Sequence, residues 1–225
     1  MNGAIIELIA ANAFLLVSHF LMSHPLRAPM VKVLGNVGFP IVYSLVSLAA
    51  LVWIYLAFTA APAADLSGSG TLGWIVATVL TIPAMVLYAG SMAGNPALPS
   101  PKAEEQARAE PKGVFKVTRH PMMWGFALWG LSHIVLHWSL RTTITAFAIA
   151  ALALVGAKLQ DRKKELLMGE AWKEWEARTS YWPRLSAFFS VGAMPWIVGI
   201  GLFAFLSWLH MPIADIAAGI WRWVY

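Results

Sequence analysis

The chain has 225 residues, of which 59% are hydrophobic and only 12% are charged, and its mean hydropathy is +0.67. A soluble domain carries about 25% charged residues, so the composition indicates an integral membrane protein and excludes an ordinary water-soluble fold. The chain contains no cysteine, which excludes disulfides, iron–sulfur clusters and cysteine-based metal sites. We attribute the net charge of +5 to membrane orientation and not to nucleic-acid binding, because of where the basic residues lie.

Six apolar runs follow one another along the chain, at about residues 4–24, 41–60, 72–91, 121–138, 141–157 and 192–211. Each is close to the roughly 20 residues that a helix needs to cross the hydrocarbon core. The sequence therefore predicts an all-α bundle of about six transmembrane helices, with 1–225 as a single membrane domain. The fourth and fifth runs are shorter and meet at Ser139–Leu140, so five spans plus a re-entrant piece is the alternative.

The basic residues gather in the segments after the first, third and fifth runs, which hold 14 of the 16 lysines and arginines. By the positive-inside rule these segments face the cytoplasm. We therefore expect a multi-pass protein of the bacterial inner membrane with both termini on the periplasmic side. The segment 158–178 alternates charges with leucine and tryptophan, which predicts an amphipathic helix lying on the cytoplasmic face.

Histidines in two of the runs are the first candidates for chemistry. Ionisable side chains inside a membrane are costly and usually functional. His19 lies near the end of the first run, and His133 follows Trp129 by one helical turn in the fourth. A neutral imidazole is the usual haem ligand, and aromatic side chains suit a flat macrocycle. We therefore expect His19 and His133 to bind a haem iron, with Trp129 beside it and His24 as the neighbouring candidate. His210, near the end of the last run, is assigned to the membrane interface.

Arg27, Arg119 and His120 are expected at the cytoplasmic mouths of the first and fourth spans. They are suited to anchoring the helices to lipid headgroups or to binding an anionic group, such as a haem propionate or a phosphate.

The depths of the two predicted axial ligands differ. His133 lies roughly 18 Å into its span from the cytoplasmic end, but His19 lies only roughly 8 Å into its own, at about 1.5 Å per residue. Two axial ligands must reach one iron, so His19 or His24 with His120 stays open as a second ligand pair.

Four segments in order, HFLMSHPLR, VLGNVGFPIVYSLVSLA, TRHPMMWGFALWGLSHIV and GEAWKEWEARTSYWPRLSAF, resemble the NnrU family of integral membrane proteins. The resemblance covers about residues 15–190 and leaves 191–225 for a sixth span and an aromatic tail. The family includes zeta-carotene isomerase, and its bacterial members are associated with denitrification. The resemblance implies a haem b site with one histidine from the first span and one after the Arg-His-Pro motif, which match His19 and His133 best.

The same resemblance implies a redox-dependent cis-trans isomerase acting on a polyene or another lipid-soluble substrate, although whether the chain is an enzyme stays open. Two departures matter. The isomerase has a cysteine three residues before its second histidine, where this chain has Gly130, so no thiolate is present there for ligand switching. The segment HFLMSHPLR also offers two histidines, His19 and His24, where the family pattern needs one.

RHPMMWG and KELLMGEAWKEWEARTSYWP also resemble, more weakly, the isoprenylcysteine and phospholipid methyltransferases of membranes. That resemblance implies S-adenosylmethionine bound at the cytoplasmic face by Arg119, His120, Gly125 and Glu165. A non-catalytic membrane scaffold is the third alternative. All three hypotheses expect contact with membrane lipids, the first also expects a lipid-soluble small molecule, and none involves nucleic acid.

Overall fold

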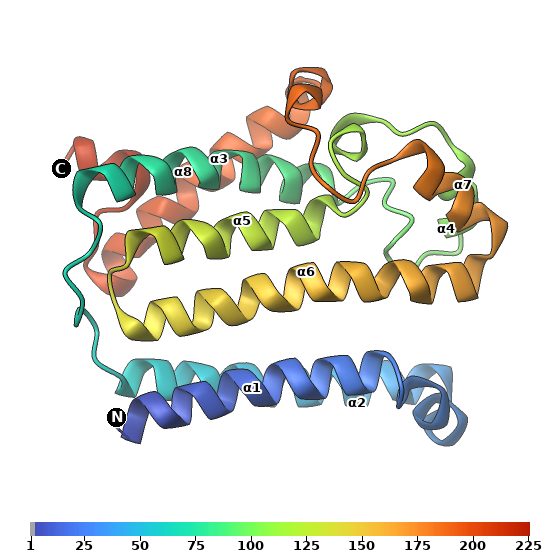
Figure 1. The fold of residues 1–225 in the computed structure, drawn as a ribbon, viewed down its shortest axis with the longest axis horizontal. Coiled ribbons are helices and arrows are strands. Elements are labelled where there is room, and N and C mark those ends of the chain that lie inside the picture. The colour runs from blue at the N-terminus through green and yellow to red at the C-terminus, as the bar shows by residue number, and fades with distance from the viewer. Residues whose placement is uncertain (1–2) are drawn as a thin grey trace.

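A computed structural model of the chain describes residues 3–225, and these residues form helices and connecting segments without any strand (Figure 1). The α-helices are α1 (Gly3–Ser23), α2 (Arg27–Ala60), α3 (Gly70–Gly90), α4 (Ala103–Arg108), α5 (Pro121–Leu136), α6 (Leu140–Met168), α7 (Glu170–Arg178) and α8 (Ala193–Ala214). Three short 3-10 helices complete the fold: η1 (Gly113–Lys116), η2 (Leu185–Ser190) and η3 (Gly219–Trp223).

All six predicted apolar runs are helical, and the prediction of an all-α membrane protein is confirmed. Five of these helices, α1, α2, α3, α6 and α8, are long and apolar enough to cross a membrane. The sixth, α5, has 16 residues and is therefore roughly 24 Å long, which is short of the roughly 30 Å hydrocarbon core. It runs between α3 and α6 and packs against both (Figure 1).

The two ends of the bundle differ in charge. Both termini lie at one end, which we call the terminal end (Figure 1). The connections after α1, α3 and α6 lie at the other end, which we call the basic end because 14 of the 16 lysines and arginines belong to those segments or to the adjoining helix turns.

Two elements differ from their predicted extents. Helix α2 begins at Arg27, well before the predicted run at 41, and contains a break at Gly35, whose φ of 73° favours glycine. The helix predicted over 158–178 is two helices: its first half continues α6 to Met168. Gly169, with a φ of 55°, ends α6. The amphipathic helix is therefore the shorter α7, which buries Trp172 and Trp175 against the core at the basic end.

Glycines allow α5 to lie close to both of its neighbours. A Cβ on Gly125 would lie 2.9 Å from the Ala84 carbonyl oxygen of α3, and one on Gly130 would lie 2.7 Å from the Ala146 carbonyl oxygen of α6. Small residues are typical of such contacts, because helices in lipid associate through close packing. Helix α5 is thus fixed between α3 and α6.

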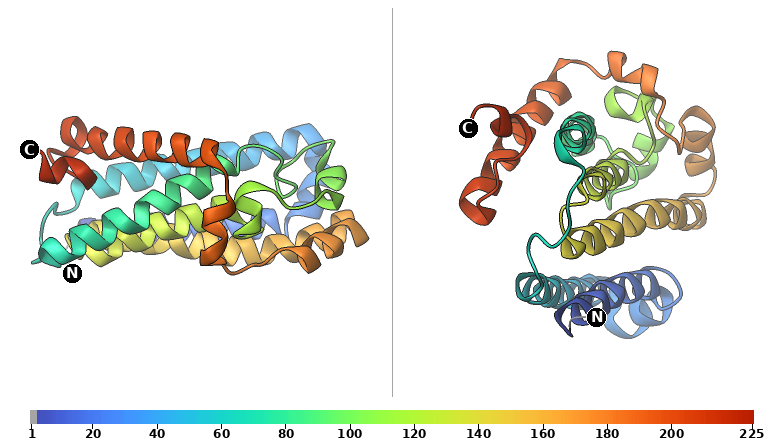
Figure 2. Two further views of the ribbon diagram at one scale, coloured as in Figure 1. Left: turned by 90° about the horizontal axis from the view of Figure 1, so that it is seen from above. Right: turned by 60° about the vertical axis from the view of Figure 1, so that its left-hand side comes forward.

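The pair α1 and α2 forms a separate layer that joins the bundle through the packing of α1 on α6, while α8 lies on the far side of α3 (Figure 2). The space between this pair and the remaining helices is where the larger of the two main cavities lies.

Candidate functional site

Two neighbouring cavities lie inside the bundle. The large cavity has a volume of about 780 Å³ and the small cavity a volume of about 70 Å³. Met85, Trp129 and Leu206 line both, so these three side chains form the wall between them. The large cavity falls in the range of small-molecule sites, roughly 300–1,000 Å³, and the small one does not.

The large cavity is apolar over most of its surface and polar at the basic end. Its wall comes from α1, α2, α3, α5, α6 and α8. Its apolar lining includes Leu15, Phe20, Leu51, Met85, Tyr88, Met123, Phe126, Trp129, Ile149, Leu152 and Leu206, and its polar lining consists of His19, Ser23, His24, Tyr43, Gln160 and Lys163, with Tyr88 adding a phenol. Such a lining suits a largely apolar ligand that carries one polar end.

His19 is a half-buried imidazole in the wall of the large cavity. Its Nε2 lies 2.5 Å from the Tyr43 hydroxyl of α2. Its Nδ1 is buried and has no hydrogen-bond partner among the described residues. One turn on, His24 lies just beyond the end of α1, and burial together with the nearby Lys163 ammonium holds the pKa of His24 below its usual value. At neutral pH, His24 is therefore mainly the neutral imidazole.

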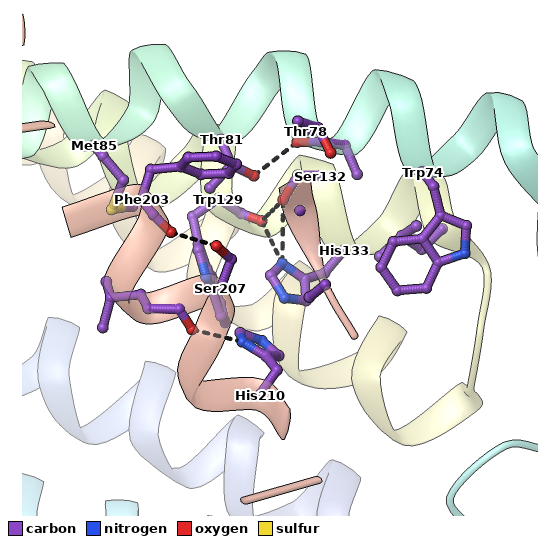
Figure 3. Close-up of a pocket in the computed structure, with 15 residues that line it drawn as sticks. Trp74, Thr78, Thr81, Met85, Trp129, Ser132, His133, Phe203, Ser207 and His210 are labelled. Atoms are coloured by element: carbon purple, nitrogen blue, oxygen red, sulfur yellow. Dashed lines mark hydrogen bonds between the residues drawn. The ribbon is translucent and has the colours of Figure 1, made fainter. Parts of the chain in front are cut away.

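The small cavity contains a pair of histidines from different helices (Figure 3). The ring centroids of His133 on α5 and His210 on α8 lie 6.3 Å apart, with an angle of 27° between the ring planes. The Nδ1 of His133 lies 2.8 Å from the Trp129 carbonyl oxygen, and the Nδ1 of His210 lies 2.8 Å from the Leu206 carbonyl oxygen.

These two hydrogen bonds fix the tautomer of each ring. A carbonyl oxygen can only accept, so each Nδ1 must carry the proton and donate it. In the neutral ring, the Nε2 of His133 and that of His210 then each hold a free lone pair. A backbone carbonyl that binds one ring nitrogen is the usual support of a metal-ligating histidine.

Hydroxyls and aromatic rings complete the lining of the small cavity (Figure 3). Ser132 and Ser207 donate to carbonyl oxygens of their own helices, Trp129 and Phe203 respectively. At the terminal end, the guanidinium of Arg222 lies 4.6 Å from the ring centroid of Trp74, which also lines the cavity. The small cavity thus contains two imidazoles, each with a free Nε2 lone pair in its neutral form, and Arg222 lies against Trp74 of its lining.

A third group of polar residues lies buried at the basic end, where α5 begins. Arg119 binds both carboxylate oxygens of Asp161 on α6, at 3.0 Å from Nε and 2.6 Å from Nη2. The Nε2 of His120 lies 2.7 Å from the same carboxylate, and Glu176 on α7 lies 3.1 Å from Arg119. We call Arg119, His120, Asp161 and Glu176 the ion cluster.

The ion cluster ties three helices together. Burial, then a hydrogen bond with Glu165 and the charge of Asp161, raise the pKa of Glu176 to about 7. Around it, the Arg119 backbone N–H donates to the Ser180 carbonyl oxygen at 2.8 Å, and the Thr118 hydroxyl donates to the Tyr181 carbonyl oxygen at 2.8 Å. The Thr-Arg-His-Pro motif is therefore a structural joint between α5, α6 and the segment after α7.

The predicted site residues thus fall in different places. His19 and His24 line the large cavity, His133 lines the small one, and Trp129 belongs to the wall between them. Arg119 and His120 belong to the ion cluster. The structure does not bring His19 and His133 into one cavity.

The remaining predicted residues have other neighbours. The Arg27 guanidinium lies 5.7 Å from the Phe39 ring centroid. Among the residues named for S-adenosylmethionine, Gly125 packs against α3, and Glu165 shares a hydrogen bond with Glu176.

Sequence reasoning missed three residues: His210, Asp161 and Lys163. His210 carried a usable signal, because it lies roughly 25 Å along α8 from the basic end and so approaches the depth of His133, at about 1.5 Å per residue. Asp161 is the first acidic residue after the long apolar run of α6, but only the fold shows that it meets Arg119. Nothing in the charged stretch 158–165 sets Lys163 apart from its neighbours.

Comparison with known proteins gives one match. The model of a family described as NnrU protein matches residues 7–218, nearly the whole chain. No curated protein and no solved structure matches it.

Proposed function

The chain belongs to the NnrU family of membrane proteins, and from that premise we propose that it binds haem b through His133 and His210, next to a large cavity for a lipid-soluble substrate. The observation that carries the proposal is the distance of 6.3 Å between the ring centroids of His133 and His210. Two imidazoles on one metal ion, each at a metal–nitrogen distance of about 2.0 Å, have ring centroids roughly 6 Å apart. This ligand pair replaces the predicted His19 with His210.

The donor set of the small cavity fits a haem iron. Each histidine presents an Nε2 lone pair and holds its Nδ1 proton on a backbone carbonyl, which also orients the ring. The volume of about 70 Å³ does not by itself hold a porphyrin. The proposal therefore requires the side chains of Met85, Trp129 and Leu206 to move toward the large cavity. The unbranched, flexible side chain of Met85 favours such a movement.

In this arrangement the bound haem would supply one-electron redox chemistry beside an apolar chamber. The apolar lining of the large cavity would keep water away from a bound substrate. The redox-dependent polyene isomerisation implied by the family resemblance would use the two cavities in this way. Chromatography of cis-zeta-carotene after incubation with the reduced protein tests it, and unchanged isomer ratios would remove that substrate.

Absorption spectroscopy of the protein, expressed with ample haem and purified in detergent, tests haem binding. We expect a Soret band, with sharp α and β bands after dithionite, in the unaltered protein and in His19→Ala. We expect His133→Ala and His210→Ala to lose these bands, because each removes one of the two imidazoles that would hold the iron. All variants should elute from a sizing column like the parent.

Two outcomes would contradict the proposal. A flat spectrum from the unaltered protein rejects haem binding. Loss of the bands in His19→Ala together with their retention in His210→Ala restores the pair His19 and His133.

We further propose that the protein lies in a bacterial inner membrane with its basic end in the cytoplasm and both termini in the periplasm. The asymmetry of lysines and arginines supports this orientation. Labelling of single cysteines placed at the two ends of the bundle tests it.

A further inference from the structure

The large cavity has a cation at its polar end. Lys163 projects from α6 into the lining, close to His24 and Gln160. The charged neighbour that acts on Lys163 is another cation, Arg27 at the start of α2. Among the described residues, neither Lys163 nor Arg27 forms an ion pair with a carboxylate.

The acidic residues beside Lys163 on α6 are bound elsewhere. Asp161 is held by Arg119 and His120 in the ion cluster. Glu165 lies close enough to Glu176 of α7 to help raise the pKa of that carboxyl. The positive charge at the polar end of the cavity is therefore not balanced by the protein itself.

A partly buried ammonium group without a counter-charge is costly, and an anion placed beside it recovers that cost. The remainder of the cavity is lined by aliphatic and aromatic side chains. We propose that the large cavity binds an amphiphile with one terminal anionic group, whose apolar body fills the cavity and whose carboxylate or phosphate pairs with Lys163.

This inference rests on the proposed use of the large cavity as a substrate site, and it narrows the substrate class. A carotene is a hydrocarbon and leaves Lys163 unpaired. A fatty acid or an alkyl phosphate satisfies both ends of the cavity, because its head reaches the cation while its chain stays among the apolar side chains.

Fluorescence titration with cis-parinaric acid, a polyene fatty acid, tests the proposal on the whole chain in a neutral detergent. The matched probe is its methyl ester, which has the same chain and no charge. We expect the acid to bind at least tenfold more tightly than the ester. Lys163→Gln should weaken binding of the acid roughly tenfold and leave the ester unchanged, because only the acid uses the ammonium group.

Two variants serve as controls. Lys32→Gln removes an exposed cation of α2 that does not line the cavity, and it should leave both probes unchanged. Gly156→Leu should block both probes, since Gly156 lines the cavity and its Cβ would meet only Phe20, at 3.8 Å. Competition by palmitate or by dodecyl phosphate then shows which anionic group the site prefers.

The proposal is overturned if the ester binds as tightly as the acid, or if Lys163→Gln behaves like Lys32→Gln. It is also overturned if Gly156→Leu leaves binding intact, because the probe then lies in the micelle. None of these readouts depends on haem, so a colourless protein that binds the acid would reject only the haem proposal.

Discussion

The hydrogen-bond partners of three histidines differ between the two cavities. His133 and His210 have their Nδ1 protons fixed by backbone carbonyls, whereas the Nε2 of His19 lies against the Tyr43 hydroxyl. Residue type alone does not separate these three imidazoles. Their hydrogen-bond partners do: a carbonyl oxygen only accepts and so fixes the tautomers of His133 and His210, whereas the Tyr43 hydroxyl can donate to His19 or accept from it.

We expect the ion cluster to stabilise the folded protein. Asp161→Asn removes the charge that Arg119 faces in a buried position, so we expect a loss of about 3 kcal/mol in the free energy of unfolding. Glu174→Gln is the control, because the ion pair of Glu174 with Arg108 is about half exposed, at 46% and 52%, and should change stability by less than about 1 kcal/mol. Thermal unfolding in detergent measures both, and equal melting temperatures would contradict the structural role of the cluster.

Helix α5 is held between two neighbouring helices. It is too short for a full crossing and is held by close packing on two sides, through Gly125 and Gly130. The same helix carries His133 and Trp129, so its position sets the distance to His210 on α8. The geometry of the small cavity therefore depends on how closely α5 packs against α3 and α6.

The close packing of α5 predicts that a methyl group added at Gly130 lowers the stability of the protein. Gly130→Ala places a Cβ 2.7 Å from the Ala146 carbonyl oxygen, so α5 must shift, at a cost of about 1–3 kcal/mol. Gly201→Ala on α8 has nothing within 4 Å of the new Cβ and should be neutral or slightly stabilising, because alanine favours the helix. Melting temperatures of the two variants in one detergent provide the comparison, and a Gly130→Ala protein as stable as its parent would rule out close α5–α6 contact.

The two cavities lie toward opposite ends of the bundle. The small cavity lies toward the terminal end, and the polar part of the large cavity lies toward the basic end. In the proposed orientation, an anionic head would enter near the cytoplasmic surface, while the imidazole pair would lie nearer the periplasm.

Because the chain has no cysteine of its own, single cysteines report orientation without background. Ser67 is exposed in the connection between α2 and α3 at the terminal end, and Ala109 is exposed in the segment after α4 at the basic end. In intact cells whose outer membrane has been permeabilised, we expect a membrane-impermeant maleimide to label Ser67→Cys and not Ala109→Cys. The reverse pattern would invert the proposed topology.

Composition and residue spacing were enough to predict an all-α membrane protein, its six apolar helices and the asymmetry of charge between the two ends. These properties follow from local composition and from residue spacing along one chain. His133 and the Thr-Arg-His-Pro motif were candidate functional residues because polar side chains in or beside apolar runs are costly. Trp129 was a candidate because it lies one helical turn before His133.

Which residues lie in contact follows from the packing of the helices and could not be predicted from local sequence. His133 faces His210 and not His19, Arg119 and His120 are bound by Asp161, and Lys163 is left without a carboxylate. Such contacts join helices that lie far apart in the sequence, and they depend on the tilt, depth and rotation of each helix. Those quantities are set by side-chain packing between helices, which local patterns do not encode.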